Sequence, residues 1–486
     1  MKPLMIICFL SICFQPLIAQ TQIGSDIPGA SASDQSGRDI ALNSNGNRII
    51  IGSFRNDGSG LDAGHARVFE YNGSNWSQIG NDIDGEATGD FSGAEVAISG
   101  DGNRVVIGAP FNDANGEDSG HARVFDLING NWMQAGNDID GVADFDNEGE
   151  SLAISADGNR IAIGTPYNDT NGTSAGHVRV FDWINGNWTQ IGVDLNGTNE
   201  FNNFGQSVSL SSSGNRLAIG APFFGDWEGQ VKVFEWNGDN WIQLGSSING
   251  EAADEQYGSA ISLSPNGIRL AIGSPSNSGE TNGYVKVLEW TGSNWIQKGA
   301  KINGGAAFDL DPTIVALSPD GTSVIIGMPF DDTNMFNAGM VRIYKELNGN
   351  WSHVGNDILG MGISAFLGEG IAISSDGSRM AVGEPTANGN NPDDGIVRVY
   401  DLPSVVAVIT LESEYDIDIF PNPVVQKINL SNSDYDFVKI IDNFGKTVFE
   451  ETIPINEIDV TSFVAGIYYL QIKTGDELIS KKIIKQ

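Results

Sequence analysis

The chain has 486 residues, of which 62 are acidic and 26 are basic, so its formal net charge at pH 7 is −36. Such an acidic balance argues against DNA or RNA as a partner. The length exceeds that of one compact core, and the 62 glycines favour an all-β protein rich in turns.

Residues 1–19 have the pattern of a secretory signal peptide: Lys2 precedes an apolar run, and Leu17-Ile18-Ala19 precedes the expected cleavage site. Both cysteines lie in this segment, so the exported chain is expected to have no disulfide and no cysteine metal site. No later apolar run approaches the ~20 residues that cross a bilayer. We therefore expect a secreted or outer-surface protein without a transmembrane segment.

A nine-residue pattern, Gly-Asn-Arg-Ile-Ala-Ile-Gly-Thr-Pro at 158–166, recurs in variant form every 53 to 56 residues. Its seven copies start at Gly46, Gly102, Gly158, Gly214, Gly267, Gly321 and Gly377. Each repeat contains alternating apolar segments separated by Gly and Asn turns, without helical periodicity. This period predicts an all-β fold, a seven-bladed β-propeller over residues 20–402 with one four-stranded blade per repeat.

Six repeats place a tryptophan after their last turn, and we expect these side chains to pack between blades. They are Trp76, Trp132, Trp188, Trp241, Trp295 and Trp351. The seventh repeat stops after its third strand, whereas residues 21–24 match the fourth-strand segment at 77–80. The N-terminal segment is therefore predicted to complete the last blade, which removes an open sheet edge.

Phe204-Gly205, followed by a strand hairpin that ends in Gly220-Ala221-Pro222, resembles the FG-GAP repeat of integrin α-subunit propellers. The resemblance covers residues 20 to about 402, and it implies a propeller with a role in binding or adhesion. That family often places an Asp-rich calcium loop in the first hairpin of a blade. The corresponding hairpin here, residues 99–104, lacks the run of carboxylates, so calcium is not expected at that position.

Beyond residue 402 the repeat ends; a linker is expected over 403–414, followed by a small Ig-like β-sandwich over 415–486. Three motifs follow in order: Phe420-Pro421-Asn422-Pro423, a strand containing Gly466, Tyr468 and Tyr469, and a basic last strand with Lys481 and Lys482. This order resembles the type A sorting domain of the bacterial type IX secretion system. The resemblance implies the type IX secretion machinery as a partner, passage through the periplasm, and release or attachment at the outer surface.

Calcium is a possible cofactor because Asp113, Asn115 and Glu117 place oxygen ligands at alternate positions, and Asp169 and Asn171 partly repeat this spacing. Ordinary solvated turns have the same composition.

Three histidines, His65, His121 and His177, occupy one repeat position. Later repeats carry Gln230, Tyr284, Met340 and Ile396 there, so a packing role is expected rather than catalysis.

Residues that break the repeat are the better ligand candidates, because packing does not require them. Trp227 could stack against a sugar, and Asp309 and Asp311 could act as acid and base or hold a cation. We expect a non-catalytic binding or adhesion protein that recognises a protein or glycan through propeller loops. The alternatives are a polysaccharide-acting hydrolase or lyase and a passive surface-layer component.

Overall fold

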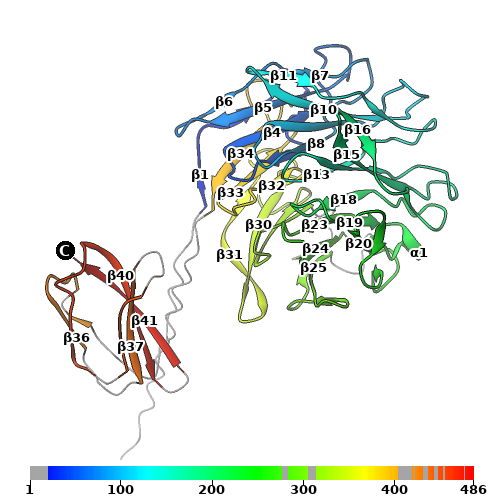
Figure 1. Cartoon of the computed structure of the whole chain (residues 1–486). Coiled ribbons are helices and arrows are strands. Elements are labelled where there is room, and N and C mark those ends of the chain that lie inside the picture. The colour runs from blue at the N-terminus through cyan, green and yellow to red at the C-terminus, as the bar shows by residue number, and fades with distance from the viewer. Residues whose placement is uncertain are drawn as a thin grey trace, which may run out of the picture. The chain divides into compact units, whose positions relative to one another are not determined.

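The computed structural model describes residues 20–275, 283–304, 314–402, 419–420, 422–430, 436–442, 447–452, 455–474 and 477–485 (Figure 1). The chain divides into two compact units, residues 1–404 and 405–486. The described residues form antiparallel sheets and one short helix, α1 (Phe224–Trp227), so the predicted all-β class is confirmed. No helix in these ranges has the length and apolarity to cross a membrane.

The first unit contains seven antiparallel sheets within its described ranges. In six of them the four main strands pair in consecutive order, and in the seventh the N-terminal strand β1 pairs with β34. The first four sheets are β3 (Ile40–Leu42), β4 (Arg48–Ser53), β5 (His65–Tyr71) and β6 (Trp76–Gln78); β8 (Glu95–Ile98), β9 (Arg104–Ala109), β10 (His121–Ile128) and β11 (Asn131–Gln134); β13 (Ser151–Ile154), β14 (Arg160–Thr165), β15 (His177–Ile184) and β16 (Asn187–Gln190); and β18 (Ser207–Leu210), β19 (Arg216–Ala221), β20 (Gln230–Trp236) and β21 (Trp241–Gln243).

The remaining three sheets are β23 (Ala260–Leu263), β24 (Arg269–Ser274), β25 (Tyr284–Trp290) and β26 (Trp295–Gln297); β28 (Ile314–Leu317), β29 (Ser323–Met328), β30 (Met340–Leu347) and β31 (Asn350–Leu359); and β32 (Ile371–Ile373), β33 (Arg379–Glu384), β34 (Ile396–Asp401) and β1 (Thr21–Gln22).

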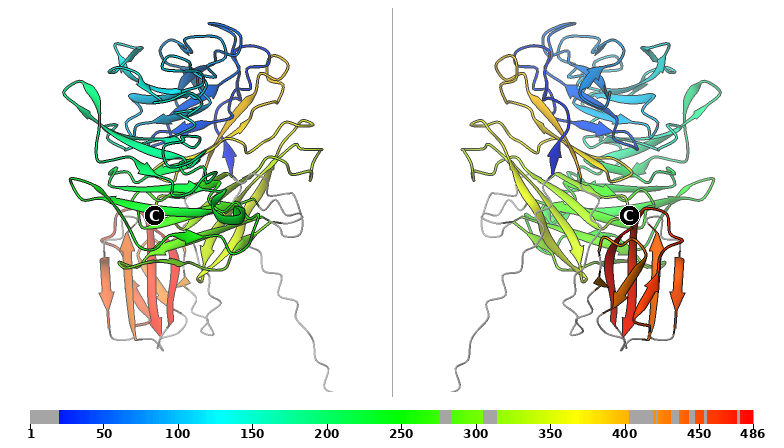
Figure 2. Two further views of the ribbon diagram at one scale, coloured as in Figure 1. Left: turned by 90° about the vertical axis from the view of Figure 1, so that its right-hand side faces the viewer. Right: turned by 90° about the vertical axis from the view of Figure 1, so that its left-hand side faces the viewer.

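These sheets surround a common centre, as Figures 1 and 2 show. The first strand of each sheet contacts the first strand of the next, and β3 also contacts β32, so the row of sheets closes on itself. The predicted role of the N-terminal segment is confirmed by the pairing of Thr21 with Asp401 and of Gln22 with Tyr400. The arrangement is consistent with a β-propeller.

The second strand of each sheet is covered by neighbouring sheets on both faces, which explains its continuous apolar sequence. In β9, only Arg104 is partly exposed, and the following five residues are buried. A Cβ atom at Gly108 would lie 2.2 Å from the carbonyl oxygen of Gly149. The second glycine of the repeat is therefore needed for a close approach between backbones of adjacent repeats.

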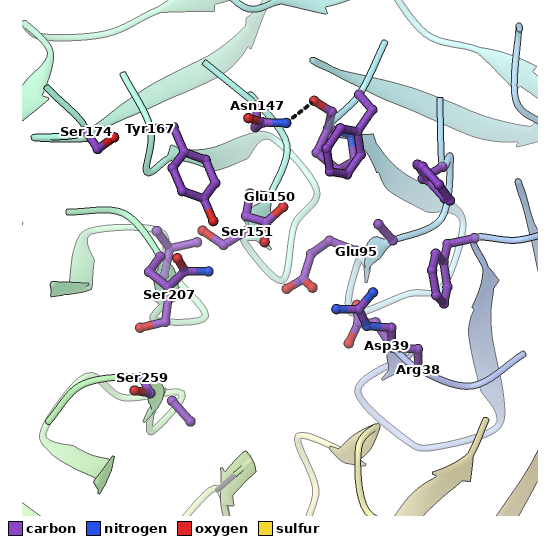
Figure 3. A pocket seen from close by; sticks show the side chains of 18 of the residues that line it. Arg38, Asp39, Glu95, Asn147, Glu150, Ser151, Tyr167, Ser174, Ser207 and Ser259 are labelled. Atoms are coloured by element: carbon purple, nitrogen blue, oxygen red, sulfur yellow. Dashed lines mark hydrogen bonds between the residues drawn. The ribbon is translucent and has the colours of Figure 1, made fainter. Parts of the chain in front are cut away.

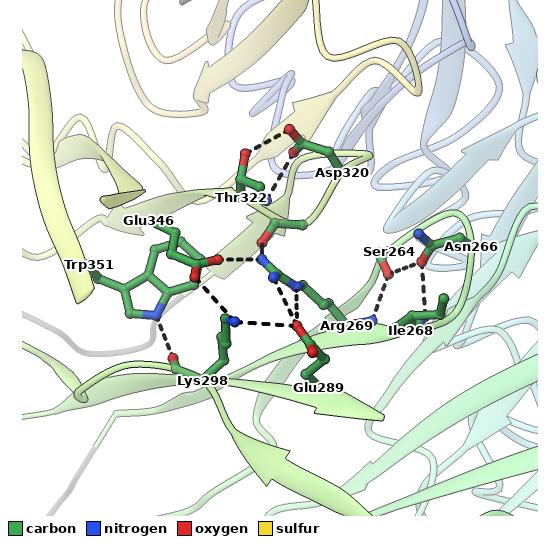
Figure 4. A network of polar contacts seen from close by, with 11 residues as sticks. Ser264, Asn266, Ile268, Arg269, Glu289, Lys298, Asp320, Thr322, Glu346 and Trp351 are labelled. Carbon is green, nitrogen blue, oxygen red and sulfur yellow. Dashed lines mark hydrogen bonds and ion pairs between the residues drawn. The ribbon is translucent and has the colours of Figure 1, made fainter. Parts of the chain in front are cut away.

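Polar contacts join neighbouring sheets at the arginine that opens each second strand, as Figure 4 shows for Arg269. Arg269 forms a 2.8 Å ion pair with Glu289 in its own sheet, and its Nη1 donates to the carbonyl oxygen of Gly321 in the next sheet at 2.8 Å. Arg379 in the last sheet donates in the same way to Gly46 near the first strand, at 3.0 Å. This contact is repeated around the closed row, which accounts for an arginine in six of the seven copies.

The predicted packing of the repeated tryptophans is confirmed, and Trp76, Trp132, Trp188, Trp241 and Trp295 are buried. Most of them also donate from Nε1 to a backbone carbonyl of the preceding sheet. The Nε1 of Trp132 donates to Ile79 at 2.9 Å, and that of Trp351 to Lys298 at 2.8 Å. Five of the six indoles therefore hydrogen-bond one sheet to its neighbour, whereas Nε1 of Trp241 is buried without a described partner.

Six short strands continue the fourth strand of their sheet and pair with the start of the third strand. They are β2 (Ile27–Pro28), β7 (Ile83–Asp84), β12 (Ile139–Asp140), β17 (Leu195–Asn196), β22 (Ile248–Asn249) and β27 (Ile302–Asn303). In the sixth sheet one long strand, β31, covers both segments, with a register shift between Val341 and Ile343. This pairing places Asp84 opposite His65 and Asp140 opposite His121.

The second unit contains two antiparallel sheets within its described ranges. They are β35 (Ile419–Phe420), β36 (Lys427–Leu430) and β39 (Glu457–Asp459), and β38 (Thr447–Glu451), β37 (Phe437–Asp442), β40 (Gly466–Thr474) and β41 (Glu477–Lys485). Their core includes Val438, Ile440 and Leu470, which are fully buried.

The predicted sorting residues are distributed over this second unit. Tyr468 is buried in its core, and Tyr469 pairs with Lys482 and Leu470 with Lys481 along β40 and β41. Phe420 is 53% exposed, and Asn422 accepts a hydrogen bond from the Ile484 backbone at 2.9 Å. Pro421 lies outside the described residues, and Pro423 follows Asn422 at the entry to the unit.

Candidate functional site

A pocket of about 970 Å³ opens where the first strands of the first unit begin (Figure 3). Its wall contains residues at the start of β8, β13, β18, β23 and β28, together with loops that connect second to third strands and loops that connect adjacent sheets. Both kinds of loop therefore lie on one face of the unit. The lining includes six carboxylates and two arginines, so the pocket is acidic.

Four of the carboxylates, Asp39, Glu95, Glu150 and Glu369, lie at or next to the start of a first strand. All four come from adjacent sheets, because the first strand of the last sheet contacts that of the first. The backbone N–H of Val96 donates to Asp39 Oδ2 at 2.6 Å, and Arg38 Nε lies 3.3 Å from Glu369 Oε1.

The described lining at or next to the starts of β18, β23 and β28 is uncharged, with Gln206, Ser207, Ser259, Ala260 and Ile314. Among the described residues at the first strands, the pocket therefore has an acidic half and a neutral half, and Asp144 and Asp169 line it from loops.

Burial raises the pKa of each of the four carboxylates at the first strands. Desolvation raises the pKa of Asp39 to about 7, and hydrogen bonds from Val96 and Ile40 only partly oppose this shift. Desolvation, with further repulsion from Asp39 and Glu150, raises the pKa of Glu95 well above its ordinary value. Near neutral pH the acidic half therefore carries groups that can hold or release a proton, or can ionise fully beside a bound cation.

Aromatic rings form the rim on the acidic side. Phe54 and Phe91 have ring centroids 5.9 Å apart, and Phe91 and Phe111 are edge-to-face at 5.2 Å. Phe145 is 52% exposed and Tyr167 is 40% exposed. Exposed rings above a polar floor suit the apolar face of a sugar or the stem of a basic side chain.

Of the three ligand residues expected from the sequence, only Trp227 is described, and it is not in the described lining. Trp227 ends α1, is 48% exposed, and packs edge-to-face on Phe223 at 5.4 Å. It lies on the connection between β19 and β20 but is not among the described residues of the pocket wall. Asp309 and Asp311 lie outside the described residues. A ligand role for these three residues stays a prediction.

The proposed calcium loops are ordered largely by their own side chains. Asp113 Oδ1 accepts a hydrogen bond from the Asp118 backbone at 2.8 Å, and the Asn115 amide donates to the carbonyl oxygen of Gly141 at 2.6 Å. Asp169 and Asn171 repeat these contacts, with Ser174 and with Gly197. Glu117 lies in the same loop as Asp113, and calcium at these positions stays a prediction.

Asp169, one of the calcium candidates, lines the pocket, but the four carboxylates at the first strands were not predicted, because only loop residues were considered as departures from the repeat. Counting back seven residues from each repeat glycine gives Asp39, Glu95, Ser151, Ser207, Ala260, Ile314 and Gly370. The neighbouring column contains Arg38, Glu150 and Glu369. These two repeat positions vary within strands that otherwise follow the repeat, and this variation is the sequence feature from which the site could have been predicted.

Comparison with known proteins identifies two segments. Residues 418–486 match the secretion system C-terminal sorting domain, and residues 83–125 match the FG-GAP repeat. The chain therefore carries an FG-GAP repeat and a type IX sorting domain. The sorting domain indicates secretion by the type IX system to the outer surface or the extracellular space, as the sequence predicted. A search of curated proteins finds no match.

Among 451 matching chains of solved structures is one titled "Crystal structure of a putative 6-phosphogluconolactonase from Bacteroides uniformis ATCC 8492". It is 15% identical, with a TM-score of 0.48, and the match covers 66% of this chain and 85% of that chain. Because that title names an enzyme, this comparison contradicts our expectation of a non-catalytic protein, and we do not retain it. A likeness this distant assigns no activity to the present chain.

Proposed function

We propose that the chain is an exported binding or adhesion protein whose first unit is a seven-bladed propeller over residues 20–402. A linker over 403–414 would then join it to an Ig-like sorting domain over 415–486. The blade count is supported by the seven sheets, by the contact between β3 and β32, and by the pairing of β1 with β34. The sorting assignment is supported by the family match over 418–486.

The observation that carries the binding proposal is the pocket with four carboxylates on one wall and aromatic rings at its rim. We propose that it recognises an extracellular protein or glycan that presents a basic or amine-bearing group. A cationic group would ionise Asp39, Glu95 and Glu150, while Phe111 and Tyr167 would contact the adjoining apolar surface. Acidic ligands would be repelled.

A second candidate function is a polysaccharide-acting hydrolase or lyase that uses the same wall. The specific observation in its favour is that Asp39, with a pKa of about 7, lies beside Glu95, whose pKa is also raised. A carboxyl group that is partly protonated near neutral pH can act as a general acid, and its ionised neighbour can act as a base.

One experiment tests both functions. The secreted protein is applied to arrays of basic peptides, amino sugars and neutral glycans, and every ligand that binds is incubated with it and analysed for chain cleavage. Glu95→Gln and Glu150→Gln are expected to reduce binding at least tenfold. Asp239→Asn removes a charge from the exposed turn between β20 and β21 and is expected to leave binding unchanged.

Cleavage that Glu95→Gln abolishes would establish the second function. Binding that neither glutamine variant weakens would refute the assignment of the pocket.

A further inference from the structure

Three histidines occupy equivalent places in the first three sheets, at the first residue of the third strand. His65, His121 and His177 are each 1% exposed. In the antiparallel register they lie opposite Asp84, Asp140 and Asn196, the second residues of the short strands β7, β12 and β17. A second carboxylate, Asp82, Asp138 or Asp194, lies two residues earlier in each case.

Five of the six imidazole nitrogens are buried without a hydrogen-bond partner among the described residues: Nε2 of His65 and both nitrogens of His121 and His177. Within the described part of the chain, neither nitrogen of His121 has one, and neither has the Oδ1 atom of Asp140. These two groups nevertheless face one another, with Nδ1 of His121 3.9 Å from Oδ1 of Asp140. A buried imidazole that is left unpaired costs free energy, so the pair is expected to have a further partner.

The first sheet repeats this geometry. Nδ1 of His65 lies 4.0 Å from Oδ2 of Asp82 and 3.9 Å from Oδ1 of Asp84. These separations are too long for hydrogen bonds. Two atoms that each bind one ion at about 2.0–2.2 Å are separated by no more than the sum of the two bond lengths. The observed separations are slightly shorter than this sum, so one ion can contact both atoms after a small movement of the side chains toward one another.

Other sheets show that the position is satisfied when its side chain is not histidine. Gln230 donates to Oδ1 of Asn249 at 2.9 Å, and Tyr284 donates to Oε2 of Glu255 at 2.8 Å. The fold therefore does not oblige this position to be unpaired. Unpaired nitrogens occur at all three histidines, so the feature that distinguishes the first two sheets is the pair of carboxylates beside the imidazole.

We propose that the first and second sheets each bind one divalent transition-metal ion, one at His65 with Asp82 and Asp84, and one at His121 with Glu86 and Asp138. In each set, one ligand atom per residue lies within 4.8 Å of the others. One imidazole with two carboxylates suits Zn²⁺ or a similar borderline ion, whereas Ca²⁺ prefers oxygen ligands alone. Asp140 is close enough to serve the second site as an additional ligand.

The surrounding charges favour a cation despite two nearby arginines. Arg67 faces His65, but its Nη2 donates to the carbonyl oxygen of Pro28. Arg123 faces His121 and lies 3.3 Å from Glu86, so Glu86 would be shared between the arginine and the ion.

The third sheet provides an internal comparison. His177 is as deeply buried, but Asn196 replaces the second aspartate. With a single carboxylate, Asp194, and an uncharged amide, this position is expected to bind Zn²⁺ far more weakly. The proposal therefore specifies two ions per chain rather than three.

The test is zinc titration calorimetry of the secreted full chain after EDTA treatment, with excess Ca²⁺ present to occupy sites made only of carboxylates. Two zinc ions are expected. His65→Gln and His121→Gln, which introduce the side chain that the fourth sheet carries, should each remove one ion, and the double variant both. His353→Gln changes a histidine with a 41% exposed side chain and should retain two.

Asp82→Asn and Asp138→Asn provide an independent check, since they alter more exposed residues and should weaken each site at least tenfold without affecting folding. X-ray absorption of the zinc complex should show one imidazole nitrogen per ion. Absence of saturable binding, or binding of two ions by the double histidine variant, would overturn the proposal.

Discussion

Replacing Asp39 by asparagine should stabilise the protein at alkaline pH. In the folded state, desolvation raises the pKa of Asp39 from 3.8 to about 7. Below about pH 4 the side chain is protonated in both folded and unfolded chains, so it has no effect on the pH dependence of stability. Between about pH 4 and pH 7 the unfolded chain releases this proton while the folded chain retains it, so stability falls over this range, and the loss is complete once the pH has passed through the folded pKa.

The magnitude follows from this shift. A shift of about three pKa units corresponds to about 4 kcal/mol as an upper limit, at about 1.4 kcal/mol per unit. Water in the pocket and coupling to Glu95 reduce it to about 1–3 kcal/mol. Asparagine retains an oxygen that can accept the hydrogen bond from Val96, so Asp39→Asn should gain this amount at pH 8 and almost nothing at pH 4.

The assay is thermal unfolding of both proteins by calorimetry at pH 4 and pH 8. For a cooperative unit of nearly 400 residues, the gain at pH 8 corresponds to a rise in Tm of about 1–4 °C. Asp144→Asn, which changes an exposed carboxylate at the same pocket, is the control for loss of charge alone. An equal gain at both pH values, or no gain at pH 8, would refute the reasoning.

Three further predictions concern the rest of the chain. Arg104→Met should lower the free energy of unfolding, measured with denaturant, by about 2–4 kcal/mol, because it removes a bidentate ion pair with Asp126 and a hydrogen bond to the next sheet. Arg55→Met, at an exposed position, should lower it by less than about 1 kcal/mol. Deletion of residues 418–486 should leave the first unit folded but retained inside the cell, as fractionation and immunoblotting would show; efficient secretion of the truncated chain would contradict this. Calcium in the Asp113 loop would give a saturable rise in Tm that Asp113→Asn abolishes, and a rise that this variant leaves unchanged would place the ion elsewhere.

The repeat made the sheets predictable because each copy encodes the same local structure. Trp132 and its equivalents could be assigned to packing from register alone, and the match between residues 21–24 and 77–80 predicted the pairing of Thr21 with Asp401. The C-terminal motifs predicted the sorting domain for the same reason, since their order in the sequence is sufficient to define it.

The pocket was harder to predict because it depends on which residues the closed row brings together. Asp39 and Glu369 are far apart in sequence and line the same pocket because β3 contacts β32. The histidines were correctly predicted to be buried. A comparison of repeat positions could not, however, show that the nitrogens of His121 would face carboxylates without a hydrogen bond.

The pairing of β1 with β34 also constrains the order of events during export. A chain that enters the periplasm from its N-terminus exposes Thr21 and Gln22 long before residues 396–401 arrive. Local sheets can form as the chain emerges, but closure must wait until almost the whole first unit has been delivered, with the sorting domain following immediately. A proteolytic cut that removed only the first few residues of the exported chain would leave β34 with an unpaired edge, and so make it a point at which another chain could add. An intact N-terminal segment is therefore required for the closed row of sheets to be completed at β34.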